Sequence, residues 1–504
     1  MSISFTNNPF FPEPFLYYFL QRPLQLSILN FQSFIAVKRI IALVVLLLFF
    51  SVDCLTFFSP ATVHAFSIKE EREYGENILA VIRKELKLVD ELDVSQYVND
   101  LGDSILAQAG PQFFDYHFYV INNKEFNAFA TPSGLIFFHS GIINVMDNEG
   151  EFVSVLAHEC GHVMSRHIAE RIEKSAKINA GTLAMMLAGI ALGGGALSQA
   201  LITGGMATGA AMSLAFTRQN EEEADRISFN LMDSQQRNPE DMLTMLNKMY
   251  KESKIRMGNI PPYLLTHPQP KLRMGYVEDL IHIKGEAQYR KFDQFAFRRM
   301  QKRVSSLTVE PQKLYGKYRK EVREATDEDI KMIGTYGLAL ADISTGNYEQ
   351  AVEKLRQVMQ FYPDKPILLT DLGIVYMQWG QLETALMYLE DARNKDPGSW
   401  YSSFYLALAL QQSGDDKRAE TLYKQILGRS FDYPKAYYQL AQIESKKGNQ
   451  ALYYLYLGKN FYYEGNFTTS TFHLKKALTL STSSRDREEI QEILDRIKKI
   501  EKES

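Results

Sequence analysis

The chain has 504 residues, 56 of them basic and 60 acidic, for a net charge of −4. This length exceeds what one hydrophobic core organises, so two or three domains are expected. The balance of charge gives no electrostatic argument for nucleic acid as a partner. There are only two cysteines, which excludes a disulfide framework without excluding an oxidising compartment.

Residues 1–65 are expected to be a leader. Lys38-Arg39 precedes eleven apolar residues (40–50), and Val63-His64-Ala65 offers a small-residue cleavage site, which is typical of a secretory signal peptide. We predict cleavage after residue 65, with an uncleaved anchor over the same apolar run as the alternative. Residues 1–36 contain one basic residue and many aromatics, so we also predict that translation starts at position 37.

The segment His158-Glu159-Cys160-Gly161-His162 lies in an apolar-periodic stretch without proline, residues 152–169, which predicts a helix. Two histidines four residues apart share a helix face, so both can bind one Zn²⁺, and the glutamate between them can reach a water on that ion. Cys160 turns away from both histidines and is expected to be a small packed residue. His167, five residues beyond the second histidine, is expected to point off the ligand face.

The segment 178–217 has no charged residue and contains eight glycines. Its length would permit a membrane span, but the glycine clusters divide it into two short apolar pieces. Three interpretations compete: a buried hairpin, a membrane-dipping hairpin and a mobile lid over the metal. Because glycine favours mobility and methionine suits adaptable apolar contacts, we favour a lid or a membrane-touching hairpin over a transmembrane pair.

A second helix is predicted to begin near residue 217, with Asn220 as its N-cap. Catalytic zinc takes three protein ligands. Glu221 and Asp225 are four residues apart and share a face, so Glu221 can be the third ligand while Asp225 orients a ligand histidine. The alternative is that the three successive glutamates at 221–223 are only a solvated helix start.

Residues 286–330 are predicted to form a basic helical linker. From 286 to 325 there are eleven Lys or Arg against five Asp or Glu. Four apolar residues can line a helix that packs on either domain, and we expect the basic residues to face solvent rather than anionic lipid. The apolar residues are Phe292, Phe295, Phe297 and Val304.

Residues 331–500 are expected to be an α-solenoid. Glycine, alanine and proline recur every 34 residues, which is the tetratricopeptide pattern of paired helices. The phase breaks at Gly465, where a last helix pair (453–480) and a charged cap (485–502) are predicted to close the stack. Such a stack offers a concave surface to peptides or proteins, and a plain helical packing domain is the alternative. The phased residues are Gly346, Gly380, Gly414, Gly448, Ala351, Ala385, Ala419, Pro363 and Pro397.

The succession of HExxH and ExxAD resembles the gluzincin-type zinc endopeptidases, which include prenyl-protein and heat-shock proteases. The resemblance implies one Zn²⁺ per chain on His158, His162 and Glu221, with Glu159 as the general base, within a domain of residues 66–285. It implies a mainly α chain. An α+β protease domain, with an active-site helix and a small sheet, would precede the α-solenoid of tetratricopeptide repeats.

Two more segments match this family. Its motif Asn-Ala-Phe-Ala-x-Pro-x-Gly stands here as residues 127–134, directly before a predicted strand, 134–139. By resemblance that strand is an edge strand that holds extended substrate, although a core strand is the alternative. The candidate substrate residues are Asn127, Ala128, Phe129 and Gly134.

The other match is Thr266-His267-Pro268, with Arg273 six residues after the histidine. The resemblance places this element near the metal. There His267 would stabilise the oxyanion or take the fourth zinc position, and Arg273 is the second candidate for the oxyanion.

The order of leader, zinc protease and repeats resembles a periplasmic branch of this family. The implied function is an exported zinc-dependent endopeptidase that cleaves misfolded or misassembled outer-membrane proteins. Its repeats would recruit substrate or the assembly machinery. The alternative is a tetratricopeptide scaffold or chaperone with a latent protease domain. Cleavage of lipid-embedded substrates is disfavoured, because the multi-span pattern of the membrane branches is missing.

Overall fold

The computed structural model describes residues 67–174, 189, 215–255, 262–428 and 433–503. The chain divides into two units, 1–65 and 66–504, and the description that follows concerns the second. The predicted leader, the predicted start at 37 and nearly all of the neutral segment 178–217 lie outside the described residues. Within the described ranges, no helix has both the length and the apolar character needed to cross a membrane.

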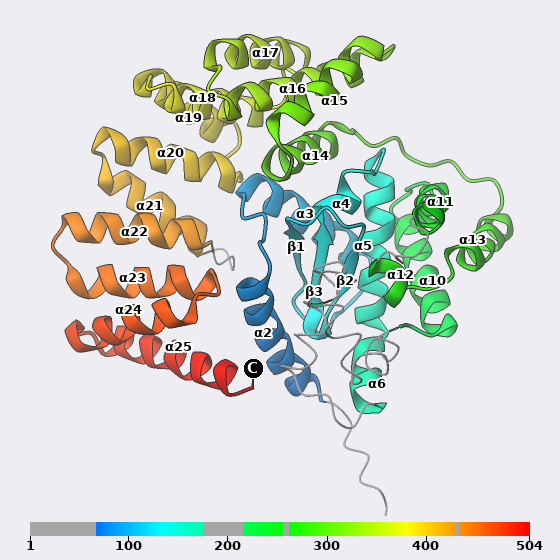
Figure 1. The fold of residues 1–504 in the computed structure, drawn as a ribbon, viewed down its shortest axis with the longest axis horizontal. Helices are drawn as coiled ribbons and strands as arrows, with labels where there is room; N and C mark the ends of the chain where they lie inside the picture. The colour runs from blue at the N-terminus through cyan, green and yellow to red at the C-terminus, as the bar shows by residue number, and fades with distance from the viewer. Residues whose placement is uncertain (1–66, 175–188, 190–214, 256–261, 429–432, 504) are drawn as a thin grey trace, which may run out of the picture. The chain divides into compact units, whose positions relative to one another are not determined.

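The first part of the second unit combines helices with a small sheet, as Figure 1 shows. Its elements are α2 (Ile68–Glu85), α3 (Leu92–Leu106), β1 (His117–Ile121), β2 (Ala128–Ala130), a 3₁₀ turn (Pro132–Gly134), β3 (Leu135–His139), α4 (Ser140–Ile143), α5 (Glu149–Met164), α6 (His167–Lys174), α10 (Arg218–Ser234), α11 (Glu240–Ile255), α12 (Pro262–Thr266) and α13 (Pro270–Lys284).

The sheet has the strand order β1-β3-β2, with β1 parallel and β2 antiparallel to β3. All five residues of β3 are buried, so the prediction of an edge strand at 134–139 is wrong and the core-strand alternative is right. Strand pairing depends on segments distant in sequence, which the local pattern does not contain. Both β1 and β2 are outer strands of this sheet, and β2 carries Ala128 and Phe129.

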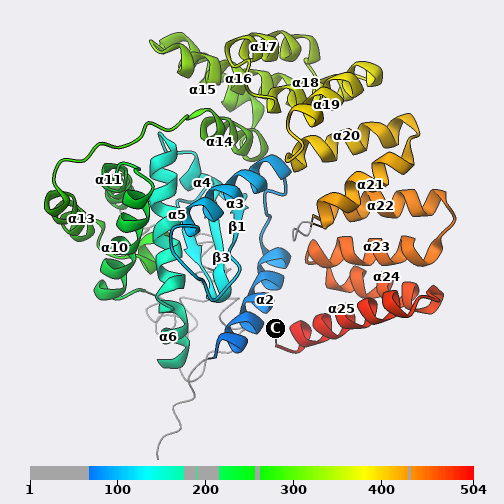
Figure 2. The same ribbon diagram turned by 180° about the vertical axis from the view of Figure 1, so that it is seen from behind.

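Helix α5 begins at an Asn148 cap, whose side chain accepts from the Glu151 N–H at 2.9 Å. The helix is buried from residue 149 to 163 and lies alongside the strands in Figures 1 and 2. Phe152 packs on Phe138 of β3, with ring centroids 4.8 Å apart. The predicted single helix over 152–169 is interrupted, because Arg166 adopts a positive φ of 52° between α5 and α6.

Helices α5 and α10 cross closely at two small residues. A Cβ added to Gly161 would lie 3.0 Å from the Cα of Ala224. The cap of α10 is Thr217, whose hydroxyl accepts from the Asn220 N–H, so the predicted cap is three residues too late. Thr217 and Asn220 belong to one capping box, and both are residue types that commonly cap a helix. The crossing brings the HExxH and ExxAD segments together.

The linker is helical, as predicted, and contains α14 (Phe295–Thr308) and α15 (Pro311–Glu324). Its basic residues are exposed on α15 but partly buried on α14. Phe297 is fully buried in the core of the sheet-containing part, and Phe295 packs on Tyr362 of the repeats. Arg299 and Lys302 are also buried, because acidic residues from other elements lie against them.

The remaining helices form an α-solenoid whose successive members lie side by side in Figures 1 and 2. The four phased glycines have φ between 74° and 92°, a backbone region that glycine enters at no steric cost. The phased alanines are fully buried. The helices are α16 (Glu328–Ser344), α17 (Tyr348–Phe361), α18 (Ile367–Gln378), α19 (Leu382–Lys395), α20 (Trp400–Ser413), α21 (Asp416–Leu427), α22 (Pro434–Lys446), α23 (Gln450–Tyr463), α24 (Phe467–Leu480) and α25 (Ser484–Glu503).

The expected fold class is therefore confirmed: a mainly α chain in which an α+β domain precedes an α-solenoid.

Candidate metal centre

Four buried side chains converge where α5, α10 and the turn after α12 meet. His158, His162, Glu221 and His267 each offer a ligand atom, and these atoms lie within 4.8 Å of one another. His158 Nε2 is 3.1 Å from His162 Nε2, and Glu221 oxygens lie 3.6 and 3.5 Å from these two nitrogens. Donors about 2.1 Å from a tetrahedral ion lie about 3.4 Å apart. The cluster therefore fits one metal ion.

The protonation states also fit a cation. Burial lowers the pKa of His162 well below its usual value, and neighbouring His158 adds to the effect. Burial likewise lowers the pKa of His267 to about 3. Both rings are thus neutral and keep a lone pair for a metal. Burial raises the pKa of Glu221 to about 7, against the attraction of Arg273 and His158, so a nearby cation would stabilise the carboxylate.

Glu159 lies on the same helix and is fully buried. Its Oε1 is 3.5 Å from His267 Nε2. Burial raises the pKa of Glu159 to about 7, while the charge of His267 and the nearby Ala130 backbone lower it. A carboxylate with a pKa near neutrality can both accept and return a proton, as a general base must.

Asp225 and Arg273 hold the ligands from behind. Asp225 Oδ1 is 2.9 Å from His158 Nδ1, on the far side of the ring from the cluster. Arg273 donates to both Asp225 oxygens, at 2.9 and 2.7 Å, and its Nη1 lies 2.8 Å from Glu221 Oε2. Arg273 is 4 % exposed. Its guanidinium thus contacts the carboxylates of Asp225 and Glu221, and its role at an oxyanion stays a prediction.

His267 is a fourth donor of the cluster. Its Nδ1 lies 3.0 Å from Glu221 Oε1 and 3.4 Å from His158 Nε2. Its ring stacks on Tyr263 with centroids 4.3 Å apart. Of the two placements expected for this histidine, the geometry matches the fourth metal position.

Two neighbours of His162 were not predicted. His167 Nδ1 lies 3.0 Å from His162 Nδ1, although a continuous helix would have turned it away. The positive φ of Arg166 changes the direction of the chain and brings His167 to His162. No pattern in the sequence predicts this change of direction. Phe216 stacks on the ring of His162 at 3.8 Å. It lies just before the α10 cap, so its place next to the metal ligands could have been suspected from the position of Glu221.

Strand β2 is a buried outer strand beside Glu159, and no described strand pairs with its other side. Thr131 donates to the Leu135 carbonyl and His139 donates to the Asn127 carbonyl. Hydrogen-bonded and non-bonded pairs alternate in an antiparallel ladder, so the polar groups of Ala128 and Ala130 are directed away from β3. The backbone polar groups of Phe129 are directed toward β3 instead. Among the described residues, neither polar atom of the buried Asn127 amide has a hydrogen-bond partner.

Gly134 lies at the turn that leads into β3. It has a φ of 87°, and an added Cβ would lie 3.1 Å from the Asp115 carbonyl oxygen. It therefore serves the turn into β3, and its contact with substrate stays a prediction.

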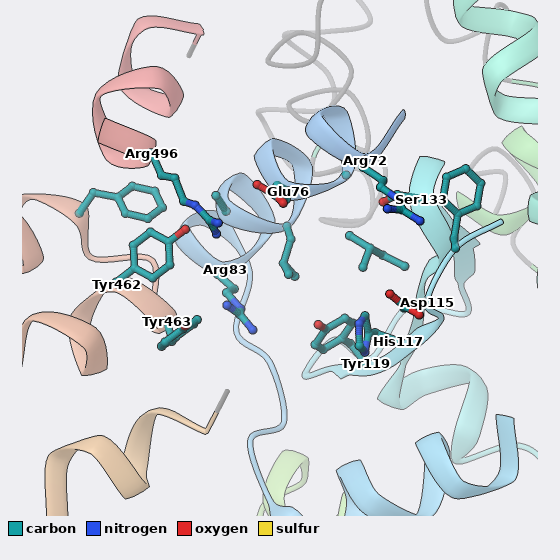
Figure 3. Close-up of a pocket in the computed structure, with 16 residues that line it drawn as sticks. Arg72, Glu76, Arg83, Asp115, His117, Tyr119, Ser133, Tyr462, Tyr463 and Arg496 are labelled. Atoms are coloured by element: carbon teal, nitrogen blue, oxygen red, sulfur yellow. The ribbon is translucent and has the colours of Figure 1, made fainter. Parts of the chain in front are cut away.

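A separate pocket of about 430 Å³ lies between α2, β1 and the last repeat helices, as Figure 3 shows. None of the four cluster residues lines it. Both acidic and basic side chains line it, and the Arg83 guanidinium lies over the Tyr463 ring at 5.3 Å. The labelled charged residues are Arg72, Glu76, Arg83, Asp115 and Arg496.

Comparison with known proteins identifies both parts of the chain. Residues 93–281 match peptidase family M48, and residues 336–365 match the tetratricopeptide repeat. The β-barrel assembly-enhancing protease of Escherichia coli K12 is 26% identical over 412 residues, covering 79% of this chain and 82% of the relative.

Two shorter relatives match the metal-binding part. Metalloprotease LoiP of Escherichia coli K12 is 30% identical over 190 residues, which are 37% of this chain and 69% of LoiP. Mitochondrial metalloendopeptidase OMA1 of Schizosaccharomyces pombe is 32% identical over 184 residues, 36% of this chain and 52% of that protein. These matches and the donor cluster define a zinc metalloprotease with C-terminal tetratricopeptide repeats. The chain belongs to peptidase family M48.

Proposed function

We propose that residues 66–285 form a periplasmic zinc endopeptidase that cleaves misfolded or misassembled outer-membrane proteins. Residues 286–330 join this domain to the repeats, 331–500, which recruit substrate or the assembly machinery. The observation that carries the proposal is the buried cluster of His158, His162 and Glu221 with Glu159 beside it. The relative named β-barrel assembly-enhancing protease, which this chain covers over 82% of its length, supports the substrate class and the partner.

We assign one Zn²⁺ per chain to His158, His162 and Glu221. Two neutral imidazoles and one carboxylate are a donor set of catalytic zinc. When bound, zinc polarises the scissile carbonyl and makes water more acidic. His267 is the additional donor, so it competes with substrate for the fourth position.

The chain's own residues then carry the proton. Glu159 takes a proton from the attacking water and returns it to the leaving amine, for which its pKa near 7 is suited. Asp225 keeps the His158 ring in place, and Arg273 keeps Asp225 and Glu221 in place. A ring N–H of His267 would donate to the oxyanion when that ring does not itself hold the metal.

Substrate is proposed to bind as an extended strand along β2. The outward polar groups of Ala128 and Ala130 pair with its backbone, as in other cases of strand addition. The Asn127 side-chain amide would form hydrogen bonds with the same substrate strand. This supports the placement, because the buried polar atoms of this amide have no hydrogen-bond partner among the described residues. The carbonyl to be cleaved would then lie beside Glu159, which is close to the Ala130 backbone.

Export follows from the predicted signal peptide at 1–65. Membrane contact by 178–217 is proposed from its composition alone.

A second candidate function is a tetratricopeptide scaffold or chaperone whose protease domain is latent. The placement of His267 among the metal donors favours it, since a closed fourth position blocks the substrate carbonyl. The two candidates agree on the metal and differ on the resting activity.

The test is degradation of an unfolded model protein by the zinc-loaded protein, beside its Glu159→Gln and His267→Ala variants. Cleavage by the wild type that is lost in Glu159→Gln supports the endopeptidase. Cleavage that appears only in His267→Ala supports the latent enzyme. No cleavage by any of the three, with zinc bound, contradicts the proposed protease activity.

A further inference from the structure

His162 has one ring nitrogen for the metal and one for the protein. Its Nε2 lies among the cluster donors, 3.1 Å from His158 Nε2 and 3.5 Å from Glu221 Oε1. A neutral imidazole that gives the Nε2 lone pair to a metal must carry its proton on Nδ1. That proton needs an acceptor, because an unpaired buried donor is costly.

The acceptor is another histidine. His167 Nδ1 lies 3.0 Å from His162 Nδ1. If His162 donates, His167 accepts at Nδ1 and carries its own proton on Nε2. That nitrogen lies 3.4 Å from Glu223 Oε2. Both rings can thus be neutral, with every proton directed to an acceptor.

We propose that His167 is a positioning residue that fixes the tautomer and the ring orientation of His162. The inference rests on the metal-binding role proposed for His162. A metal-ligating histidine commonly donates its second N–H to a protein acceptor, which orients the ring and raises its basicity.

The local fold is built around this contact. Arg166 has a positive φ of 52°, unusual for a residue with a side chain, and this turn carries His167 back toward α5. The Arg166 guanidinium forms an ion pair with Glu71 of α2, whose side chain is 3 % exposed. His167 itself is buried. On the His162 ring face, Phe216 stacks at 3.8 Å, so both the plane and the edge of the ring are fixed.

The two histidine ligands are therefore held by different groups. His158 Nδ1 lies 2.9 Å from the carboxylate of Asp225. His162 Nδ1 instead contacts the His167 ring, whose other nitrogen lies near the Glu223 carboxylate. Glu223 also accepts from Ser165 Oγ at 2.8 Å and is 58% exposed in its side chain. Of the three successive glutamates, Glu222 only pairs with Arg226 at the surface.

The test measures zinc affinity of the purified protein by competition with a chromophoric chelator. His167→Leu removes the acceptor and is expected to weaken zinc binding about 10- to 100-fold. His167→Asn keeps an acceptor oxygen close to the position of Nδ1 and is expected to bind nearly as the wild type does. Glu223→Gln should show a smaller loss than His167→Leu, and Glu222→Gln, its matched control, should show none.

Two further readouts separate positioning from general stability. Visible absorption of the Co²⁺-substituted protein reports ligand geometry and should change in His167→Leu but not in Glu222→Gln. The melting temperature of the metal-free protein should be similar in His167→Leu and His167→Asn, while the increase in melting temperature on adding zinc should be smaller in His167→Leu.

Unchanged zinc affinity and an unchanged Co²⁺ spectrum in His167→Leu would overturn the inference while leaving the proposed enzyme intact. Equal losses of affinity and of metal-free stability in His167→Leu and His167→Asn would also overturn it, since His167 would then be a packing residue. If His167→Leu does not fold, a Glu223→Gln variant that matches Glu222→Gln in zinc affinity and Co²⁺ spectrum overturns it. A wild type that takes up no zinc contradicts the proposed function itself.

Discussion

Arg299 of α14 forms a buried, two-bond ion pair with Asp371 of α18. Its Nη2 donates to Asp371 Oδ1 at 2.7 Å and its Nε donates to Oδ2 at 3.1 Å. The remaining nitrogen, Nη1, donates to Asp93 of α3 at 2.9 Å. One guanidinium thus joins the linker helix, the metalloprotease domain and the repeats. Tyr336 and Tyr401 donate their hydroxyls to the same Asp371 carboxylate.

Removing Arg299 should be strongly destabilising. Arg299→Met would leave the buried Asp371 carboxylate without its cation, whereas Asp93 would keep Arg303. Breaking a buried pair in this way costs about 3–5 kcal/mol. The neighbouring Arg298 is the matched control, because its pair with Asp329 is partly exposed, and such a pair contributes about 0–1 kcal/mol. Denaturant unfolding of both variants measures the difference. An equal loss of unfolding free energy in the two variants would show that the burial of the Arg299 ion pair does not increase its contribution to stability.

The same cluster should make the protein sensitive to acid. Burial alone would raise the pKa of Asp93, but Arg303 and Arg299 hold it below its usual value. A carboxyl group whose folded pKa is lowered stabilises the fold above its unfolded pKa, about 3.9, and loses this contribution as pH falls through the folded pKa. Melting temperatures between pH 3 and 6 should therefore fall less steeply below pH 4 in Asp93→Asn than in the wild type. Parallel curves would rule out this role for Asp93.

Local geometry explains what could be predicted from sequence. Residues four apart on one helix share a face whatever the rest of the chain does, so His158 with His162, and Glu221 with Asp225, were accessible to motif reasoning. The phased glycines were accessible too, because a left-handed turn between two helices requires glycine at that position. The metal cluster follows from the first rule and the repeat stack from the second.

What could not be predicted depends on contacts between distant segments. The place of β3 in the middle of the sheet depends on β1 and β2 together. The burial of Arg299 could not be predicted, because its partners Asp93 and Asp371 are 206 and 72 residues away. His167 was misplaced for another reason, since one positive φ at the preceding residue overrides helical spacing.

The HExxH segment itself offers a pair of neighbouring substitutions. Glu159→Gln should lower the rate of peptide cleavage by about 10²- to 10⁴-fold, the usual loss when a general base is removed, and should leave zinc binding intact. Cys160→Ala is the matched control, because Cys160 is fully buried in the hydrophobic core on the next position of the helix. It should retain activity and zinc. A Cys160→Ala enzyme without zinc would make the thiol a ligand, contrary to this assignment.

The crossing of α5 and α10 predicts opposite effects for two glycine substitutions. In Gly161→Ala the new Cβ would lie 3.0 Å from the Cα of Ala224, and backbone cannot yield as a flexible side chain does. The helices must separate, which should cost about 1–3 kcal/mol and move Glu221 away from His158 and His162. The variant should therefore unfold at lower denaturant and bind zinc more weakly.

Gly275→Ala on α13 is the control for this crossing, because an added Cβ there meets nothing within 4 Å. Alanine is the better helix former by about 0.5–1 kcal/mol, so this variant should be slightly more stable, with zinc affinity unchanged. Stabilisation in both variants would mean that α5 and α10 have room for a methyl group. The close approach of Gly161 to Ala224 would then not be what sets the distance between the histidines and Glu221.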